Sequence, residues 1–175
     1  MGLFSGFLEK SNLIGGRPVG VPNEWALMEQ VCKDWALVSR NVPKQVVFTV
    51  LKTWANSWCT TTRLHEAVIW PCIFGCPGEE DRLSHYLRCT RFWSGIGASA
   101  RADGPIYEDP LVKISLSLPS VRWSKLIVVA SRCYHSIKFD YPHEVERAIE
   151  SSSFVQIEQL LEELAAHYCS ELGVT

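Results

Sequence analysis

The sequence lacks an apolar run long enough to cross a membrane, and it lacks a dominant charge of one sign. A transmembrane helix needs about 20 consecutive apolar residues, and the net charge of the chain is only −2. The first residues also lack the basic start and the long apolar centre of a secretory signal. We therefore expect no membrane partner and an intracellular location, nuclear or cytoplasmic.

Motifs of common active sites are also absent. The sequence contains no G-x-x-x-x-G-K-[ST] phosphate loop, no G-x-S-x-G elbow and no H-E-x-x-H metalloprotease motif. His65-Glu66 followed by Pro71-Cys72 partly matches the zinc deaminase signature H-x-E…P-C-x-x-C. It departs twice, because Glu66 adjoins the histidine and three residues separate the two cysteines instead of two. The sequence therefore predicts a protein that is not an enzyme.

Cysteine, in contrast, is plentiful. Seven cysteines in a chain without an export signal favour reduced thiols and metal binding over a disulfide framework. Four potential ligands follow the spacing C-x3-C-x8-H-x3-C, namely Cys72, Cys76, His85 and Cys89. Zinc prefers thiolate and imidazole ligands, and four protein ligands are typical of a structural site. We predict that these four residues bind Zn2+; the alternative is that they are ordinary buried cysteines and a hydrogen-bonded histidine.

Local sequence features are expected to shape this site. Gly75 and Gly78 can adopt the positive φ that folds a loop around one ion. A helix from Arg82 to Cys89 would place His85 and Cys89, four residues apart, on one face. Three acidic residues would precede it as first-turn acids, which the helix dipole favours: Glu79, Glu80 and Asp81.

Apolar residues at steps of three and four predict an all-α fold, a small helical domain built around a Cys3His zinc knuckle. We expect helices over residues 23–41, from Pro43 to about 58, and over 82–89, 109–118, 120–134 and 142–172, the last interrupted at 151–153. The first two would pack as an antiparallel pair. Residues 68–70 would form a short extended lead-in to the first cysteine pair, and residues 95–105 the main linker.

The chain divides into three expected regions. Residues 1–22 form a loose N-terminal lead, residues 23–104 a helical zinc-binding region, and residues 105–175 a C-terminal helical region that ends in an acidic amphipathic helix. Charge follows this division: residues 1–139 contain 16 Lys and Arg against 11 Asp and Glu, whereas residues 140–175 contain one against eight. The acidic end should therefore repel nucleic acid.

The stretch from Arg82 to Arg101 contains four arginines and no acidic residue. Such a basic patch can contact phosphate, although arginines on a helix also form an ordinary solvated face.

Several of these residues resemble a known family. Thr61-Thr62-Arg63-Leu64, the cysteine pair, the run from Glu80 to Cys89 and Phe92-Trp93 resemble the zinc-binding region that follows the polymerase in many non-LTR retrotransposon reverse transcriptases. The resemblance covers residues 54–93. It implies zinc bound by the four ligands and a role in gripping element RNA or target DNA. The C-x3-C spacing departs from the commoner C-x2-C, and the polymerase motif Tyr-x-Asp-Asp does not occur.

Two functions remain open at this point. In the first, the module binds RNA or DNA, with bases stacked on Tyr86, Phe92 or Trp93 and phosphates bound by Arg82, Arg88, Arg91 and Arg101. In the second, zinc staples a helical scaffold that binds a protein partner or a second copy through the apolar face of residues 154–172. The local arginines and the resemblance favour the first function, whereas the near-neutral net charge favours the second.

Overall fold

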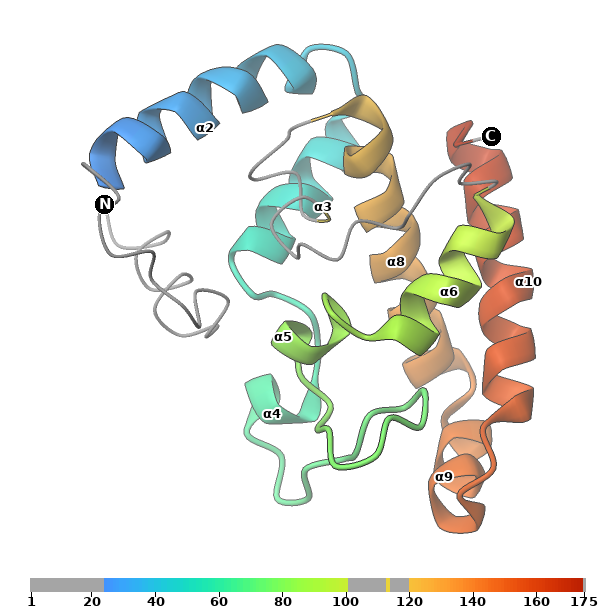
Figure 1. Ribbon diagram of the computed structural model, residues 1–175. Coiled ribbons are helices and arrows are strands. Elements are labelled where there is room, and N and C mark those ends of the chain that lie inside the picture. Colours follow the sequence, from blue (N-terminus) through green and yellow to red (C-terminus); the bar gives the residue numbers. More distant parts are fainter. Residues whose placement is uncertain (1–23, 101–112, 114–119, 175) are drawn as a thin grey trace.

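The computed structural model describes residues 24–100, 113 and 120–174 of the chain. These residues form helices and loops, with no β-strand among them and one isolated β-bridge between Pro71 and Glu80 (Figure 1). The predicted all-α class is therefore confirmed, and the predicted extended lead-in to the cysteine pair amounts to this one bridge. None of the described helices is long and apolar enough to cross a membrane. The predicted lead 1–22, Arg101 and all of the predicted helix 109–118 except Lys113 lie outside the described residues.

The helix boundaries follow local sequence signals. Ser120 caps the N-terminus of α8, since its side chain accepts a hydrogen bond from the backbone N–H of Trp123 at 3.0 Å, as its position before the helix predicts. The predicted break at residues 151–153 separates α9 from α10. The helices of the described chain are α2 (Glu24–Ser39), α3 (Lys44–Trp54), α4 (Thr61–Leu64), α5 (Leu83–Tyr86), α6 (Thr90–Ser99), α8 (Val121–Asp140), α9 (Pro142–Ser151) and α10 (Val155–Leu172).

Helix α8 is the central element of the core. It packs against α3, α9 and α10 and touches α6. Its buried side chains include Leu126, Ile127, Ala130, Cys133 and Tyr134, all of which the spacing of apolar residues predicts. One hydrophobic core joins residues before and after the segment 101–119, so the described parts of the predicted regions 23–104 and 105–175 fold against each other.

Helix α10 packs against both α6 and α8 (Figure 1). It buries Ile157, Leu161, Ala165 and Cys169 in the core. The apolar face of residues 154–172 therefore packs within the chain, which leaves little of it exposed for the docking surface of the second open function.

Gly95 lets α6 approach α10 closely. A Cβ atom at this position would lie 2.6 Å from Cδ2 of Leu161, which is closer than packed atoms approach. Because α6 runs to Ser99, the predicted linker 95–105 begins too early in the chain.

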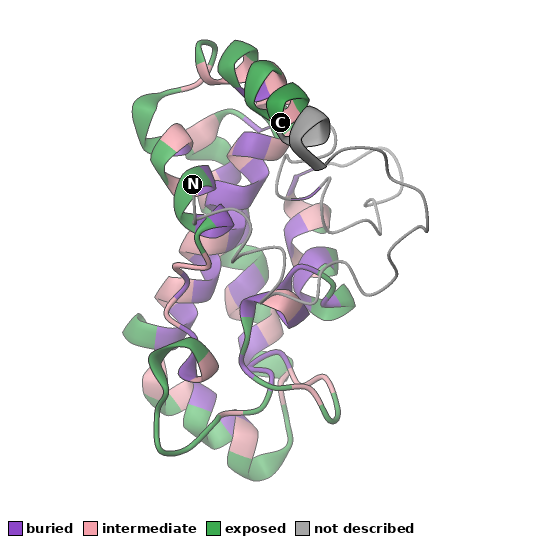
Figure 2. Ribbon diagram, turned by 90° about the vertical axis from the view of Figure 1, so that its left-hand side faces the viewer, coloured by how far each residue is buried: buried purple, intermediate pink, exposed green. Residues whose placement is uncertain are grey.

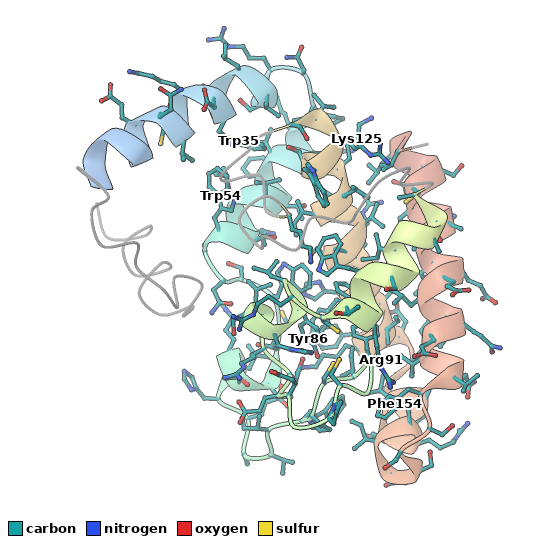
Figure 3. All side chains as sticks on the ribbon, in the orientation of Figure 1. Trp35, Trp54, Tyr86, Arg91, Lys125 and Phe154 are labelled. Carbon is teal, nitrogen blue, oxygen red and sulfur yellow. The ribbon has the colours of Figure 1, made fainter. Side chains whose placement is uncertain are left out.

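Helix α2 adds little to the core, and much of its surface is exposed (Figure 2). Trp35 is buried, with its ring centroid 5.3 Å from that of Trp54 on α3 (Figure 3). Cys32 and Ala36, predicted on the same buried face, are exposed. Helix α3 packs mainly on α8, and the predicted antiparallel pairing of α2 and α3 is not among the extensive contacts between the described helices. Helix α3 also ends at Trp54 instead of near residue 58.

The Gly95→Val variant should be less stable than the unmodified chain by about 1–3 kcal/mol, because the added side chain overpacks the α6–α10 contact. The matched control is Ser94→Val, which adds the same side chain at an exposed position of the same helix and should change stability by less than about 0.5 kcal/mol. Urea unfolding measures both. Equal effects of the two variants would contradict the close packing at Gly95.

Candidate metal centre

The first two candidate ligands lie on a loop that is closed by two backbone hydrogen bonds. The N–H of Cys72 donates to the carbonyl of Glu79, and the N–H of Asp81 donates to the carbonyl of Trp70, each at 2.8 Å. Trp70 and Cys72 therefore lie beside Asp81 and Glu79, and the chain between them forms a loop that contains both cysteines.

Two glycines make the turns of this loop. Gly75 and Gly78 have φ of 77° and 70°, as predicted from the need to fold the loop around one ion. Gly75 also lies against the ring of Phe154, at the start of α10, where a Cβ atom would overlap that ring. Figure 3 shows Phe154 beside Arg91 at this end of the molecule. The loop is thus packed against the C-terminal part of the chain.

The second pair of ligands does not share one helix, which corrects the prediction of a helix over residues 82–89. Helix α5 ends at Tyr86, and α6 begins at Thr90. Cys89 stands before α6 as its N-cap, in an extended conformation, and its sulfur accepts a hydrogen bond from the backbone N–H of Phe92 at 3.4 Å. At this break between α5 and α6, the Cys89 sulfur lies 3.4 Å from the Cys76 sulfur of the loop.

The four predicted ligands come together in the structure. The ligand atoms of Cys72, Cys76, His85 and Cys89 all lie within 4.8 Å of one another, and the sulfurs of Cys76 and Cys89 are 3.4 Å apart. Tetrahedral zinc places neighbouring sulfurs about 3.8 Å apart, given Zn–S bonds of about 2.3 Å. Cys72, Cys89 and His85 are buried and Cys76 is partly buried. The four residues can hold a metal ion, and their chemistry is compatible with zinc.

The imidazole of His85 fits a metal ligand. Its Nδ1 lies 3.2 Å from Oε2 of Glu79. Its Nε2 is buried and has no hydrogen-bond partner among the described residues. An unpartnered buried nitrogen costs about 1–3 kcal/mol, and a metal ion bound at Nε2 would remove that cost.

The three thiols differ in their tendency to ionise. A hydrogen bond from the Cys89 thiol lowers the pKa of Cys72 to about 4, although burial opposes this shift. The same hydrogen bond, together with burial, raises the pKa of Cys89. Burial and the negative charge of Cys72 raise the pKa of Cys76. The Cys72 thiolate therefore forms readily, and its negative charge opposes deprotonation of Cys76 and Cys89. A bound divalent cation would allow all three thiols to be deprotonated together.

The three acidic residues before α5 do not act as first-turn acids, which corrects that prediction. Glu79 contacts the ring of His85. Glu80 is more than half exposed and lies 3.8 Å from Arg82. Asp81 is completely buried. Each acid has a separate role because the chain here is a loop and not the start of a long helix.

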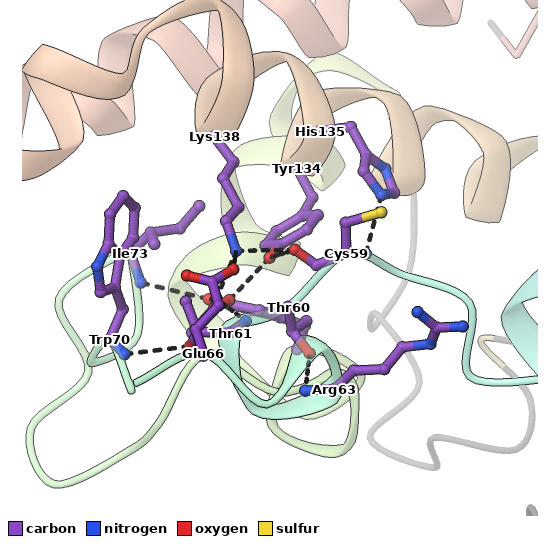
Figure 4. Close-up of polar contacts among 12 residues, drawn as sticks. Cys59, Thr60, Thr61, Arg63, Glu66, Trp70, Ile73, Tyr134, His135 and Lys138 are labelled. Atoms are coloured by element: carbon purple, nitrogen blue, oxygen red, sulfur yellow. Dashed lines mark hydrogen bonds and ion pairs between the residues drawn. The ribbon is translucent and has the colours of Figure 1, made fainter. Parts of the chain in front are cut away.

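Asp81 is the centre of a buried hydrogen-bond network. Figure 4 labels three of its partners, Thr61, Tyr134 and Lys138. One carboxylate oxygen accepts from the hydroxyls of Tyr86 and Tyr134, each at 2.8 Å. The other accepts from the backbone N–H of Thr61 at 2.7 Å and from Nζ of Lys138 at 3.0 Å. Four donors satisfy the buried charge, as a carboxylate in a protein interior requires.

The partners of Asp81 are held as donors. Burial and the charge of Asp81 raise the pKa of both Tyr86 and Tyr134, so both phenols stay protonated. Lys138, on α8, is itself 5% exposed and also donates to the carbonyl of Cys59 at 2.7 Å. Sequence analysis missed this network, because Lys138 lies 57 residues from Asp81 and nothing local to either residue pairs them.

The described arginines of the predicted basic patch are exposed. Arg82 lies 3.6 Å from Glu79, and Arg91 lies 3.6 Å from Glu158, with side chains 45% and 48% exposed. Arg88 is exposed and makes no ion pair with another described residue. The structure thus leaves all three side chains at the surface beside the candidate metal centre.

The aromatic residues predicted to stack on bases are buried instead. Trp93 is 3% exposed, and its indole N–H donates to the carbonyl of Tyr86 at 2.8 Å. Tyr86 and Phe92 are completely buried. The predicted stacking role of Trp93, and of the other two rings, is therefore wrong: these rings belong to the core that supports α5 and α6.

Comparison with protein-family models, with curated proteins and with solved structures gives no match for this chain. Its function has to be argued from the geometry of the candidate metal centre and its surroundings.

The Lys138→Met variant should lower the free energy of unfolding by about 3–5 kcal/mol, because it leaves the Asp81 charge buried without its cation. Lys125→Met is the matched control, since Lys125 lies on the same helix and makes an exposed hydrogen bond to the carbonyl of Gly173. It should cost less than about 1 kcal/mol. Guanidinium unfolding compares the two variants, and similar losses would contradict the anchoring role of the Asp81–Lys138 pair.

Proposed function

We propose that this chain is a structural zinc-binding module, derived from the region after the polymerase of a non-LTR retrotransposon reverse transcriptase, and that it binds RNA or DNA without catalysing a reaction. The observation that carries the proposal is the convergence of three sulfurs and one imidazole within 4.8 Å. Catalytic zinc sites keep a coordination position open for water or substrate, whereas four protein ligands close the site.

The residues that carry the family resemblance support this origin, because they act as one structural unit. The N–H of Thr61 donates to Asp81, and the Thr61 hydroxyl accepts from the N–H of Trp70 at 3.1 Å, next to the loop of the first cysteine pair. Trp93, at the other end of the resembling stretch, holds the carbonyl of Tyr86. The residues that resemble the family therefore lie around the candidate metal ligands and are joined to one another by hydrogen bonds.

The proposed contact with nucleic acid is made to phosphate. The ion pairs of Arg82 and Arg91 are exposed, and exposed pairs contribute only about 0–1 kcal/mol, so a phosphate can replace the carboxylate partner. Arg88 extends the same basic surface. Because the aromatic rings nearby are buried, this surface offers backbone contacts and no base stacking, and the binding we propose does not depend strongly on sequence.

The alternative is a zinc-stapled helical scaffold for a protein partner or for self-association. The C-terminal helix is a weak candidate surface, since its apolar face packs on α6 and α8. Phe48 and Leu51 on α3 are 63% and 39% exposed, and these side chains favour a protein contact at α3 instead. This function takes second place because it gives no role to the exposed arginines beside the candidate metal centre.

The proposed site of action is the nucleus or the cytoplasm. All seven cysteines are free thiols, and thiols persist in reducing compartments. A zinc site with three thiolate ligands needs the same reducing conditions.

The purified chain should bind about one zinc ion, and Cys76→Ser or Cys89→Ser should abolish stoichiometric binding, since structural zinc sites depend on each ligand and are coupled to folding. Cys32→Ser is the control, because Cys32 is exposed on α2, outside the cluster. Elemental analysis by mass spectrometry measures the metal content. Unchanged zinc in the Cys76 and Cys89 variants would reject this ligand set.

Affinity for single-stranded RNA and DNA should fall steeply with salt, because phosphate binding releases counterions. The double variant Arg88→Ala with Arg91→Ala should reduce the slope of log K against log salt by about 2, roughly one for each lost contact. Arg147→Ala is the control, since Arg147 is the one basic residue of the acidic C-terminal end. Gel shifts at several salt concentrations give the slopes, and absence of binding by the unmodified chain at low salt would refute the nucleic-acid function.

A further inference from the structure

We propose that Glu79 is a positioning residue of the metal centre: its carboxylate fixes the tautomer and the orientation of His85, so that Nε2 is the nitrogen that binds the metal. This inference rests on the zinc-binding part of the proposed function. It assigns a role to a residue that the spacing of cysteine and histidine does not reveal.

The hydrogen-bonding chemistry of the two side chains determines the tautomer. Oε2 of Glu79 lies 3.2 Å from Nδ1 of His85. An ionised carboxylate can only accept hydrogen bonds, and a neutral imidazole carries its proton on one nitrogen alone. The contact therefore places the proton on Nδ1 and leaves a lone pair on Nε2, which is the form that a metal ligand requires.

The other ring nitrogen supplies an independent observation. Nε2 of His85 is buried and has no hydrogen-bond partner among the described residues, and His85 belongs to the group whose ligand atoms converge within 4.8 Å. Without Glu79 the proton could move to Nε2, which would then have no lone pair to offer a metal ion. A carboxylate behind a histidine ligand prevents this and increases the basicity of the ring.

Glu79 also joins the two halves of the site. Its carbonyl accepts the N–H of Cys72 at 2.8 Å, while its side chain reaches His85 on α5. A single residue thus sets the distance between the cysteine loop and the helix that carries the imidazole. Arg82 lies 3.6 Å from the same carboxylate oxygen in an exposed ion pair.

The next residue provides a matched control. Glu80 has the same side chain and a similar exposure, but its carboxylate lies near Arg82 at 3.8 Å and makes no contact with His85. Replacing Glu80 removes the same charge from the same loop without removing the contact to the ring. Any difference between the two positions therefore reports the hydrogen bond and not the local charge.

The experiment compares the full chain with Glu79→Ala, Glu79→Gln and Glu80→Ala, each loaded with zinc. Competition with a chelator should show a 10- to 100-fold loss of zinc affinity for Glu79→Ala, the range typical for such outer partners. Glu79→Gln should lose less, since an amide oxygen still accepts from Nδ1, and Glu80→Ala should match the unmodified chain. Long-range 1H–15N spectra of the His85 ring should show a proton on Nδ1 and metal at Nε2.

Three results would overturn the inference: unchanged zinc affinity in Glu79→Ala, equal losses in Glu79→Ala and Glu79→Gln, or a metal ion bound at Nδ1. If the unmodified chain takes up no zinc, the proposed function fails, but the inference about Glu79 is still tested by the metal-free protein. There the ring spectra should show the Nδ1–H tautomer in the unmodified chain and a shift towards Nε2–H in Glu79→Ala. The same tautomer mixture in both proteins would refute the role of Glu79.

Discussion

A buried carboxylate must be given donors, and in this protein the donors of Asp81 come from three separate parts of the chain. Thr61 belongs to α4, Tyr86 to α5, and Tyr134 and Lys138 to α8. A low-dielectric interior makes each of these bonds strong and makes the loss of any one costly. The N–H of Asp81 also closes the loop of the first cysteine pair. The hydrogen bonds that satisfy the buried Asp81 carboxylate therefore also position Cys72 and Cys76, two of the candidate ligands.

The candidate metal centre and the hydrophobic core therefore depend on each other. The loop that carries Cys72 and Cys76 has no regular secondary structure beyond one bridge, so it gains little from helical hydrogen bonding. It is held by the Asp81 network on one side and by the ring of Phe154 at Gly75 on another. A bound metal ion would add a third attachment, where Cys72 and Cys76 of the loop meet His85 on α5 and Cys89 after it.

Much of this architecture can be predicted from the sequence, and the reasons are local. Apolar periodicity locates the long helices, because a helix that packs on a core must present one apolar face. The spacing of cysteine and histidine identifies the four residues whose sulfurs and imidazole converge, because they recur at short intervals within one loop and the turn that follows it. Ser120 and the serines at 151–153 mark a helix start and a helix break for equally local reasons.

The features that escape prediction are set by residues far apart in the chain. The acids at 79–81 have the composition of a helix start, and only the position of Lys138 on α8 makes Asp81 a core residue. Tyr86 and Trp93 are aromatic residues of the kind that stack on bases, and they lie near arginines in the sequence. They are buried in the structure, because residues distant in the chain pack over them. The apolar periodicity correctly locates the buried face of α10. Periodicity alone does not show that this face packs on α6, where the small Gly95 allows close approach.

Cys89 is at once a candidate ligand and the N-cap of α6. If the Cys89 sulfur is held in the cluster, the residue at which α6 starts is fixed. The direction in which each later side chain of α6 points is then fixed as well. Phe92, one turn further on, is directed inward, while Arg91 is directed outward. An insertion of a single residue between Cys89 and Phe92 would rotate the rest of the helix by about 100° and turn Phe92 and the other buried side chains away from the core, so this short interval tolerates substitution far better than any change in length.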